Sequence, residues 1–424
     1  MLQLQVIRDQ SEKVLTGLNK RNFKEAEALI SRVIETDKLR RDTQRTLDDI
    51  KAKSNSDSKK IGELMKAGKN EEATALRNSV AADKDRIKQL EAEMASAEAD
   101  LQQLLYKIPN IPSEKVPAGK SADDNITANQ WGKVPTLPAD AQPHWELIKK
   151  YDIIDFELGV KISGAGFPVY KGKGARLQRA LINFFLDEAI ALGYKEIQPP
   201  IVVNEASGYG TGQLPDKDGQ MYFASEDKLY LIPTAEVPIT NLYRDVVLNE
   251  DELPVKNVGY TPCFRREAGS WGAHVRGLNR LHQFDKVEIV RIARPEESYA
   301  VLEEMCLHVQ GLLEKLELPY RRLLLCGGDM GFTSAMTYDM EVYSAAQQRW
   351  LEVSSVSNFE TFQANRLKLR YRGKDGKVQL AHTLNGSALA LPRIVAAILE
   401  NNQSKDGISI PKILRPYTGF DSIS

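Results

Sequence analysis

A sustained heptad pattern between residues 76 and 104 is the feature that most narrows the folds open to this chain. Apolar residues recur there at alternating steps of four and three, which is the spacing of the buried seam of a coiled coil. One acidic residue interrupts the series. The pattern predicts a long helix that packs along a second helix. Its seam consists of Leu76, Val80, Asp83, Ile87, Leu90, Met94, Ala97, Leu101 and Leu104.

The partner helix is expected in the residues that come before this seam. Residues 24–106 contain no proline and are dense in residues that favour helices. The sequence AGKN at 67–70 supplies a turn, so we expect an antiparallel hairpin of two helices, each about 50 Å or longer at 1.5 Å per residue. The first helix keeps Leu29, Val33, Leu47, Ile50, Ile61 and Leu64 in phase, with Thr36, Arg40, Thr43, Ser54 and Asp57 at the intervening positions.

Positive charge gathers along the first of these helices, whereas most acidic residues of the hairpin lie near its base or on the second helix. This asymmetry suits an RNA backbone, and the hairpin has no aromatic residue before Tyr106 at its base, which limits such recognition to shape and phosphates. The alternative is a solvated face, which is what charge runs on long helices usually are. The basic residues are Lys38, Arg40, Arg41, Arg45, Lys51, Lys53, Lys59 and Lys60.

A segment rich in proline and polar residues divides the chain into a helical arm at 1–107, a connection at 108–143 and a globular domain at 144–424. The formal net charge is -1, so any contact with nucleic acid must come from a local basic patch. Three cysteines without a CxxC pair indicate free thiols in a reducing compartment. With no signal-peptide pattern and no membrane span, we expect a cytoplasmic protein.

Residues 261–292 predict an antiparallel hairpin with one charged face. Alternation along the first strand puts Arg265 and Glu267 on one face. On the second strand Val287 and Ile289 face the core. The opposite face of that second strand carries His282, Phe284, Lys286 and Glu288.

The loop of this hairpin combines planar bidentate donors with glycines that let a ligand approach the backbone, which suits a polyphosphate. A solvated antiparallel sheet is the alternative, and these residues alone leave both open. The loop contains Arg265, Arg266, Gly269, Gly272, Arg276, Gly277 and Arg280.

Four further stretches carry polar residues in an apolar context. Residues 174–192 predict a helix whose broad apolar face suits either the core or a dimer interface, followed by a strand in YKEIQPPIVV. Glu236, in LYLIPTAEVPIT, could bind a ligand ammonium group or only begin a helix. Arg393 lies just inside the helix that follows a turn at Asn385 and Gly386, where no dipole effect favours a cation, so we expect an anionic or aromatic partner.

The fourth stretch, RWLEVSSVSN at 349–358, predicts a strand with Trp350, Glu352 and Ser354 on one face. Ser355 is out of phase with Glu352, so joint use of the two requires a strand end, a bulge or a bound ion. A carboxylate with a hydroxyl suits Mg²⁺, and polar pairing between strands is the alternative.

Together these stretches resemble the bacterial seryl-tRNA synthetases, which are class II aminoacyl-tRNA synthetases. GARLQRALINFFLDEAIALGYKEIQPP resembles the first class II motif, FRREAG with LHQFDKVE the second, and NGSALALPRIVAAILENNQ the third, while TAE and EVSSVSN resemble segments typical of the seryl family. The resemblance covers essentially the whole chain. It implies an α+β protein, a homodimer with an antiparallel catalytic sheet flanked by helices, whose antiparallel coiled-coil arm grips the long variable arm of serine tRNA.

The resemblance implies an AMP-forming ligase. ATP and L-serine would give seryl-adenylate and pyrophosphate with the help of Mg²⁺, and serine would pass to the 3' end of tRNA(Ser) and also of tRNA(Sec). Glu352 and Ser355 would hold the metal. The serine site would comprise Thr234, Ala235, Glu236, Arg265, Glu288 and Ser387.

The ATP site implied by the resemblance centres on three catalytic residues, Arg265, Glu352 and Arg393. Arg265 would contact the α-phosphate and the serine carboxylate, Phe284 would stack on the adenine, and Arg393 would cover its other side. Glu267 would contact the adenine edge. The full set is Arg265, Arg266, Glu267, Arg280, Phe284, Glu352, Val353, Ser354, Ser355 and Arg393.

Three departures from the family pattern lie beside these residues: the loop SWGAHVRG, Val356 where cysteine is common, and Asn365 where arginine is expected. A relative that activates an amino acid for a non-tRNA acceptor would lack the basic arm. A non-catalytic paralogue would have lost one of the three catalytic residues. A structural coiled-coil protein would leave the domain at 144–424 without a purpose.

Overall fold

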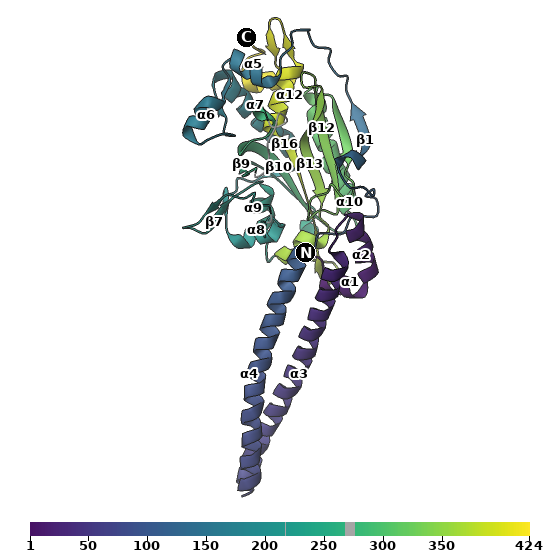
Figure 1. Ribbon diagram of the computed structural model, residues 1–424, viewed down its shortest axis with the longest axis vertical. Coiled ribbons are helices and arrows are strands. Elements are labelled where there is room, and N and C mark those ends of the chain that lie inside the picture. Colours follow the sequence, from purple (N-terminus) through teal and green to yellow (C-terminus); the bar gives the residue numbers. More distant parts are fainter. Residues whose placement is uncertain (217, 268–275) are drawn as a thin grey trace. The chain divides into compact units, whose positions relative to one another are not determined.

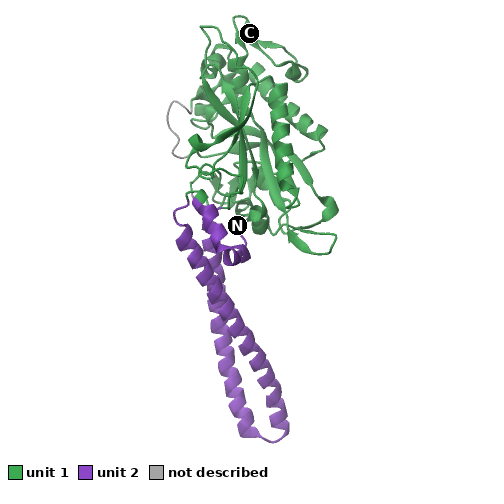
Figure 2. Cartoon of the chain, turned by 90° about the vertical axis from the view of Figure 1, so that its right-hand side faces the viewer, with its two compact units in different colours: residues 1, 20–22, 110–424 green, residues 2–19, 23–109 purple. Residues whose placement is uncertain are grey.

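The computed structural model describes residues 1–216, 218–267 and 276–424. The chain divides into two compact units (Figure 2). Unit 2 comprises Leu2–Asn19 and Phe23–Pro109. Unit 1 comprises Met1, Lys20–Asn22 and Asn110–Ser424.

Unit 2 is helical, and its two long helices α3 (Ala26–Lys66) and α4 (Asn70–Lys107) form the expected antiparallel hairpin (Figure 1). The 41 residues of α3 span about 60 Å at 1.5 Å per residue. Gly68 lies in the turn with φ +75°, a backbone conformation that favours glycine. Two shorter helices that the sequence patterns did not predict, α1 (Leu4–Asp9) and α2 (Ser11–Lys20), precede the hairpin.

The predicted seam of α4 is confirmed by burial, since Leu90, Met94, Ala97, Leu101 and Leu104 are all buried. The interrupting Asp83 forms an ion pair with Lys53 of α3, with Nζ 3.1 Å from Oδ2. The polar middle of the α3 seam is also confirmed. Its buried polar residues include Thr43, Ser54 and Asp57.

One polar residue of α3 was not expected in the seam. Asp37 is 3% exposed, and its carboxylate accepts hydrogen bonds from Arg40 and Arg41 and lies 3.5 Å from Arg8 of α1. Burial acts to raise the pKa of Asp37, but the hydrogen bonds and charges of Arg40 and Arg41 lower it below its ordinary value. Asp37 therefore ties α1 to α3 and keeps two arginines of the basic face in place.

The centre of unit 1 is an eight-stranded sheet with the strand order β1-β11-β12-β13-β16-β10-β9-β4 (Figure 1). All neighbouring strands are antiparallel except β4 and β9. The predicted α+β class with an antiparallel sheet is therefore confirmed. In sheet order the strands are β1 (Ile126–Trp131), β11 (Tyr320–Leu324), β12 (Met336–Ser344), β13 (Arg349–Asn358), β16 (His382–Ala390), β10 (Gln283–Ala293), β9 (Val255–Phe264) and β4 (Lys195–Glu196).

Helices α7 (Gly172–Ala191), α10 (Ser298–Lys315) and α12 (Leu391–Asn401) pack against this sheet and close the main core. Val287 and Ile289 of β10 are fully buried in that core, as predicted. The other helices of unit 1 are α5 (His144–Lys150), α6 (Phe156–Ile162), α8 (Glu205–Thr211), α9 (Glu236–Asn241), α11 (Thr361–Leu367) and α13 (Arg415–Thr418).

Four small sheets complete unit 1. Their strands are β2 (Ile154–Asp155) with β3 (Val169–Tyr170); β5 (Val202–Val203), β7 (Leu229–Leu231) and β6 (Phe223–Ala224); β15 (Val378–Leu380), β14 (Arg370–Arg372) and β8 (Val247–Asn249); and β17 (Gln403–Ser404), β18 (Gly407–Ser409) and β19 (Ser422–Ile423).

Two local predictions were wrong. The expected continuous strand in YKEIQPPIVV is split at Pro199 and Pro200, so that β4 and β5 belong to different sheets. The expected turn at Asn385 and Gly386 lies inside β16, which pairs with β10 on one side and β13 on the other. Glycine is needed there because a Cβ at position 386 would come 2.9 Å from a methyl group of Val356.

The segment 108–143, expected to connect the two parts of the chain, contributes strand β1 to the edge of the large sheet. From Asn110 onward it belongs to unit 1. All three cysteines are free, as predicted from their spacing, and the structure shows that all three are buried. Within the described ranges, no helix combines the length and the apolar character needed to cross a membrane.

The hairpin seam makes a direct prediction for stability. Leu101→Ala should lower the free energy of unfolding of the arm by about 2–5 kcal/mol, because Leu101 is 5% exposed in the seam. Leu39→Ala is the matched control, since Leu39 is 60% exposed on α3 and its loss should change stability little. Thermal and urea unfolding of both variants would test this, and equal effects would contradict the seam.

Candidate active site

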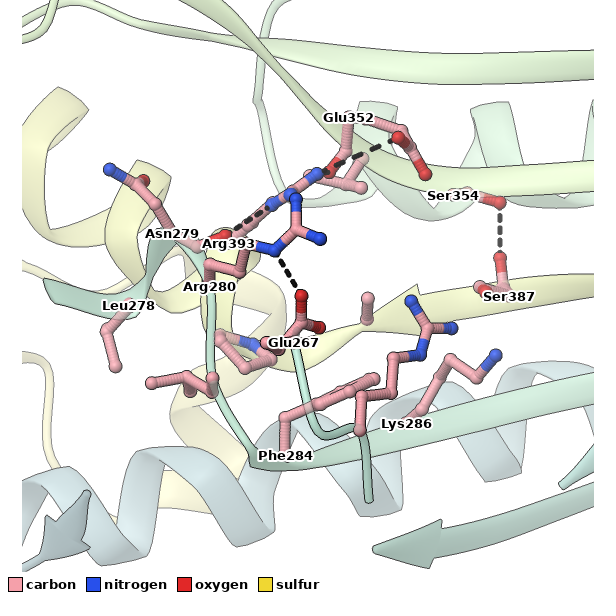
Figure 3. Close-up of a pocket in the computed structure, with 15 residues that line it drawn as sticks. Glu267, Leu278, Asn279, Arg280, Phe284, Lys286, Glu352, Ser354, Ser387 and Arg393 are labelled. Carbon is pink, nitrogen blue, oxygen red and sulfur yellow. Dashed lines mark hydrogen bonds and ion pairs between the residues drawn. The ribbon is translucent and has the colours of Figure 1, made fainter. Parts of the chain in front are cut away.

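Strands β13, β16 and β10 are neighbours in the sheet, and side chains from all three border a cavity of about 220 Å³ (Figure 3). Further walls come from α12 and from the segments that flank residues 268–275. The cavity is lined by Arg265, Glu267, Leu278, Asn279, Arg280, Leu281, Phe284, Lys286, Glu352, Val353, Ser354, Ser387, Ala390, Pro392 and Arg393.

Arg265 and Glu267 both line the cavity, but the strand alternation that predicted this was wrong. Strand β9 ends at Phe264, and Glu267 has φ +50°, so no regular strand continues through these residues. The Glu267 carboxylate forms an ion pair with Arg280 (Figure 3). The predicted Gly269 and Gly272, together with the segment SWGAHV, lie outside the described residues.

Two other arginines of this segment do not reach the cavity. Arg276, predicted among the phosphate donors, forms an ion pair with Glu146 at 3.1 Å and lies 4.9 Å from the centre of the Trp145 ring. Arg266 donates its backbone N–H to the Gln220 carbonyl at 2.8 Å, and its side chain is not among the described residues that line the cavity. Arg276 is held by its contacts with Trp145 and Glu146, so its side chain does not belong to the predicted phosphate site.

Arg393 reaches into the cavity from the first turn of α12, between Asn279 and Glu352 (Figure 3). Its Nε donates to the Asn279 carbonyl at 3.0 Å, and its Nη1 donates to the Glu352 carbonyl at 2.6 Å. The Glu352 carboxylate lies 3.9 Å from the same Nη1. Arg393 thus has an anionic neighbour within the protein, and an anionic or aromatic ligand as its partner stays a prediction.

A cation–π pair forms another wall of the cavity. The Arg265 guanidinium carbon lies 5.2 Å from the centre of the Phe284 ring, and Arg265 Nε donates to the Pro233 carbonyl at 3.4 Å. Each contact restricts the direction of the guanidinium. Both side chains also line the cavity, so a planar ring and a fixed positive charge lie next to each other.

Strand β13 carries a bulge, which is one of the three arrangements that the phase of its polar residues left open. Glu341 of β12 pairs with Glu352, and the next β12 residue inward, Met340, pairs with Ser354, which leaves Val353 as the extra residue. Val353 and Ser354 both line the cavity. The Ser354 hydroxyl donates to the Ser387 carbonyl at 2.5 Å, which joins β13 to β16 at the cavity wall (Figure 3).

Ser355 lies beyond the bulge, opposite Asp339 of β12, and hydrogen-bonds to the Asp339 carboxylate. Burial, followed by the charge of Glu352, raises the pKa of Asp339 well above its ordinary value. Among the described residues, Asp339 Oδ1 is buried without a hydrogen-bond partner. Glu352, Ser355 and Asp339 thus form a group of oxygen donors of the kind that Mg²⁺ prefers.

A second polar group, next along β10, surrounds the residues predicted to bind serine. Lys286 Nζ lies 2.5 Å from Glu288 Oε2, and both side chains are buried. The Thr234 hydroxyl accepts from Lys286 at 2.9 Å and donates to Glu288 at 3.3 Å. Ser387 of β16 pairs directly across from Glu288. Ala235, also predicted in this site, is fully buried immediately before α9.

Glu236 is the first residue of α9, so its interpretation as a residue that begins a helix is confirmed. Its carboxylate also accepts from Gln363 Nε2 at 2.6 Å and from Gln213 Nε2 at 3.5 Å. Burial, followed by the charge of Glu288, raises the pKa of Glu236 to about 7. A cationic ligand would favour the ionised form.

Sequence patterns missed several residues of this region. Asn279 lines the cavity and holds Arg393, and Lys286 neutralises Glu288, although only its strand face was predicted. Gln363 lies on α11, a segment in which only the departure at Asn365 had been noted. Arg349 borders, with Arg280 and Arg393, a further cavity of about 170 Å³. Its position at the start of β13 gave no indication of that role.

The sheet and the residues around its cavity define the class of protein. Residues 222–402 match the family model of the tRNA synthetase class II core domain (G, H, P, S and T), so this part of the chain is a class II synthetase core. Residues 1–112 match the model of the seryl-tRNA synthetase N-terminal domain.

Similar proteins extend the match to the full length. The chain is 51% identical to the serine–tRNA ligase of Salinibacter ruber, with 100% of this chain and 99% of the relative covered, and 48% identical to that of Caldicellulosiruptor saccharolyticus, with 100% of both covered. The chain therefore belongs to the seryl-tRNA synthetase family. The similar structures include Pyrococcus horikoshii seryl-tRNA synthetase complexed with ATP, with a TM-score of 0.94, 33% identity and 100% and 99% coverage.

A second similar structure is the cytoplasmic serine–tRNA ligase of Naegleria fowleri in complex with AMP. Its TM-score is 0.88 at 25% identity, with 100% of this chain and 99% of that chain covered. The fold is thus shared over both units.

The raised pKa of Glu236 predicts a pH-dependent stability difference. The carboxyl binds its proton more tightly in the folded state, so its contribution to stability is lost as pH rises from 4.5 to about 7. Glu236→Gln removes this titration and should gain up to about 3 kcal/mol relative to the original protein between pH 5 and pH 8. Urea unfolding of both proteins at the two pH values measures this, and a constant difference would contradict it.

Proposed function

We propose that this protein activates L-serine with ATP, giving seryl-adenylate and pyrophosphate, and transfers serine to the 3' end of tRNA(Ser). The single observation that carries this proposal is the cavity in which Arg265 and Arg393 meet Phe284 and Glu352 beside the group around Glu288. One half of that arrangement suits a nucleotide and the other a small amino acid. The full-length similarity to serine–tRNA ligases supports the same activity.

ATP would bind with its adenine against Phe284 and its phosphates toward the arginines. A planar ring stacks well on Phe284, and Arg393 reaches the cavity from another wall. Glu267 would accept from the adenine edge once its ion pair with Arg280 opens, which would free Arg280 for the phosphates. Val353 and Ser354 would border the nucleotide, and Arg349 would add a third positive charge where pyrophosphate leaves.

Glu352 and Ser355 would hold Mg²⁺, and Asp339 would support Ser355 from the neighbouring strand. Mg²⁺ usually takes only one or two protein carboxylates and completes its shell with water and phosphate oxygens. In the described part of the chain no cluster of three or more acidic, histidine or cysteine side chains suits a metal, which fits so sparse a protein contribution. When bound, the ion neutralises phosphate charge.

The activation step joins two anions, the serine carboxylate and the α-phosphate of ATP. A carboxylate oxygen forms a bond to phosphorus in line with the bond to the bridging oxygen, which breaks to release pyrophosphate. Arg265 would contact both anions and Arg393 the departing phosphates, so their charges offset the repulsion and stabilise the developing negative charge. No protein nucleophile is needed.

Serine would be recognised through its amino group and its hydroxyl. The amino group would bind at Thr234, Ala235 and Glu236, where the charge of Glu236 is available near neutral pH. The hydroxyl would donate to Glu288 and contact Ser387 across the strand pair. Alanine lacks this hydroxyl and would leave the buried Glu288 without that partner. Such a loss can make kcat/KM for alanine about 10⁴-fold lower than for serine.

The arm would bind tRNA through its basic face. Lys51, Lys53 and Lys60 form ion pairs within unit 2, whereas Lys38, Arg45 and Lys59 have no ion-pair partner among the described residues. The second group is therefore available for phosphates.

The same proposal includes tRNA(Sec) as a substrate, a homodimer that uses the exposed apolar residues of α6 and α7, and a cytoplasmic location.

Activation of an amino acid for a non-tRNA acceptor is the second candidate. The presence of the complete arm, and its match to the N-terminal domain of seryl-tRNA synthetases, favour tRNA as the acceptor.

Amino-acid-dependent exchange of pyrophosphate into ATP tests the activation step. Among the standard amino acids only serine should support rapid exchange. Glu288→Gln should abolish exchange with serine. The amide has one acceptor oxygen and no negative charge, so it accepts more weakly from the serine hydroxyl, and Lys286 loses its charged partner. Circular dichroism would show whether the variant is folded, and full activity in a folded variant would refute the role of Glu288.

Charging of tRNA(Ser) tests the arm. Replacing Lys38, Arg45 and Lys59 by glutamine should raise the KM for tRNA by about tenfold or more and reduce its salt dependence, while serine-dependent exchange stays unchanged. The matched control replaces Lys51, Lys53 and Lys60, which removes the same charge from residues already paired. The proposal for the unpaired residues fails if both triple variants charge tRNA equally well.

A further inference from the structure

A fully buried polar cluster lies outside the residues assigned to the substrates. His144 of α5 and Glu400 of α12 have side chains with 0% exposure. His144 Nδ1 lies 2.7 Å from Glu400 Oε1, and the His144 backbone N–H donates to the same oxygen at 2.9 Å. The other carboxylate oxygen accepts from the Ser344 hydroxyl. Three hydrogen bonds thus satisfy polar groups for which the lack of a partner in the interior would be costly.

The protonation state of the imidazole follows from its second nitrogen. The backbone N–H of Leu278 donates to His144 Nε2 at 2.9 Å, so Nε2 carries no proton. The ring proton must then be on Nδ1, which donates it to Glu400. Glu400 therefore selects the one neutral tautomer that can hold Leu278.

The approach of this segment to the imidazole is close enough to require glycine. Gly277 has φ +66°, and a Cβ there would lie 2.3 Å from His144 Nε2. Residues Gly277–Asn279 form the short helical turn η4, and Leu278 and Asn279 of this turn line the cavity. His144 therefore fixes η4 at its first two residues.

A second connection runs from Glu400 through Gln347, in the turn between β12 and β13. Gln347 Nε2 donates to Glu400 Oε1 at 2.9 Å. Gln347 Oε1 accepts from Asn279 Nδ2 at 3.0 Å and from Arg349 Nε at 3.1 Å. One amide thus holds Asn279 and Arg349 together.

Both connections end at the arginines of the phosphate cavities. The Asn279 carbonyl accepts from Arg393 Nε at 3.0 Å, and Arg349 and Arg393 border the same small cavity. Glu400 follows Arg393 by seven residues on α12, about two helical turns, so both side chains lie on the same side of the helix. A shift of Glu400 would therefore be transmitted to the carbonyl and the amide that aim the two arginines.

We propose that Glu400 is a positioning residue for ATP, which acts through His144 and Gln347 to hold η4, Arg393 and Arg349 in the direction that the phosphates require. The inference rests on the proposed function, because it takes Arg393 and Arg349 as the phosphate contacts. Arginines whose side chains are held in place before ATP binds lose less conformational entropy on binding. They also stabilise the charge of the transition state without having to rearrange. The serine group around Glu288 shares no hydrogen bond with this network in the described residues, so its affinity for serine is independent of Glu400.

Steady-state pyrophosphate exchange with Gln347→Leu and Glu400→Gln tests the proposal. Gln347 is only partly buried in a turn, so its variant keeps the protein testable even if the buried Glu400 variant does not fold. Each variant should raise the KM for ATP or lower kcat, giving a loss in kcat/KM for ATP of about 10–100-fold, with the KM for serine unchanged. ATP binding measured by calorimetry should weaken in parallel.

A double variant separates positioning from general stability. If both residues act through one network, Glu400→Gln combined with Gln347→Leu should lose little more than the worse single variant, whereas independent effects would add. Ser298→Ala is the matched control, since Ser298 is a buried hydroxyl that bonds to His382 and Asn358 in another part of unit 1. It should lower Tm without changing either KM.

Two results overturn the proposal: an unchanged KM and kcat for ATP in folded Gln347→Leu, or an equal rise in the KM for serine and for ATP. Failure of the proposed function would look different, because the original protein would then show no serine-dependent exchange. A functional original protein with insensitive variants would refute only the role of Glu400.

Discussion

The pairing of β16 with β10 on one side and β13 on the other is the constraint on which the rest of unit 1 depends. Antiparallel pairing sets Glu288 opposite Ser387 and Val356 opposite Gly386. Because strand side chains alternate, this register turns the polar residues toward the cavity while Ile289 enters the core. A slip of one residue would bury the polar face and expose the apolar one. The helices pack against the sheet and enlarge the core, but the register of the strands determines which side chains lie next to each other.

Buried charge is the second determinant of the site. The Lys286–Glu288 pair is removed from water, and the loss of hydration is offset by their contact and by the hydroxyl of Thr234. Burial, followed by the nearby charge of Glu288, raises the pKa of Glu236 to about 7. Ionisation of Glu236 is therefore unfavourable in this buried position beside Glu288. In the proposed function, the ammonium group of serine would supply a positive charge beside Glu236.

Much of the fold and part of the site could be predicted from the sequence. The heptad steps from Leu76 to Leu104 predicted the long hairpin, because burial repeats regularly along a helix. The phase conflict between Glu352 and Ser355 predicted a strand end, a bulge or a bound ion, and Val353 forms a bulge. The grouping of Arg265 with Glu267 was also predicted, but for a reason that the end of β9 at Phe264 makes wrong.

The sequence by itself determined the coiled-coil arm, the α+β class and the family. Regular periodicity and short motifs are local, so they can be recognised without knowing which residues are in contact in the folded protein. Only the tertiary structure decided that Arg276 turns to Trp145 and that His144 meets Glu400. The physical reason is distance along the chain. A hydrogen bond between residues more than two hundred positions apart leaves no period in the sequence and exists only once strands and helices have fixed both ends.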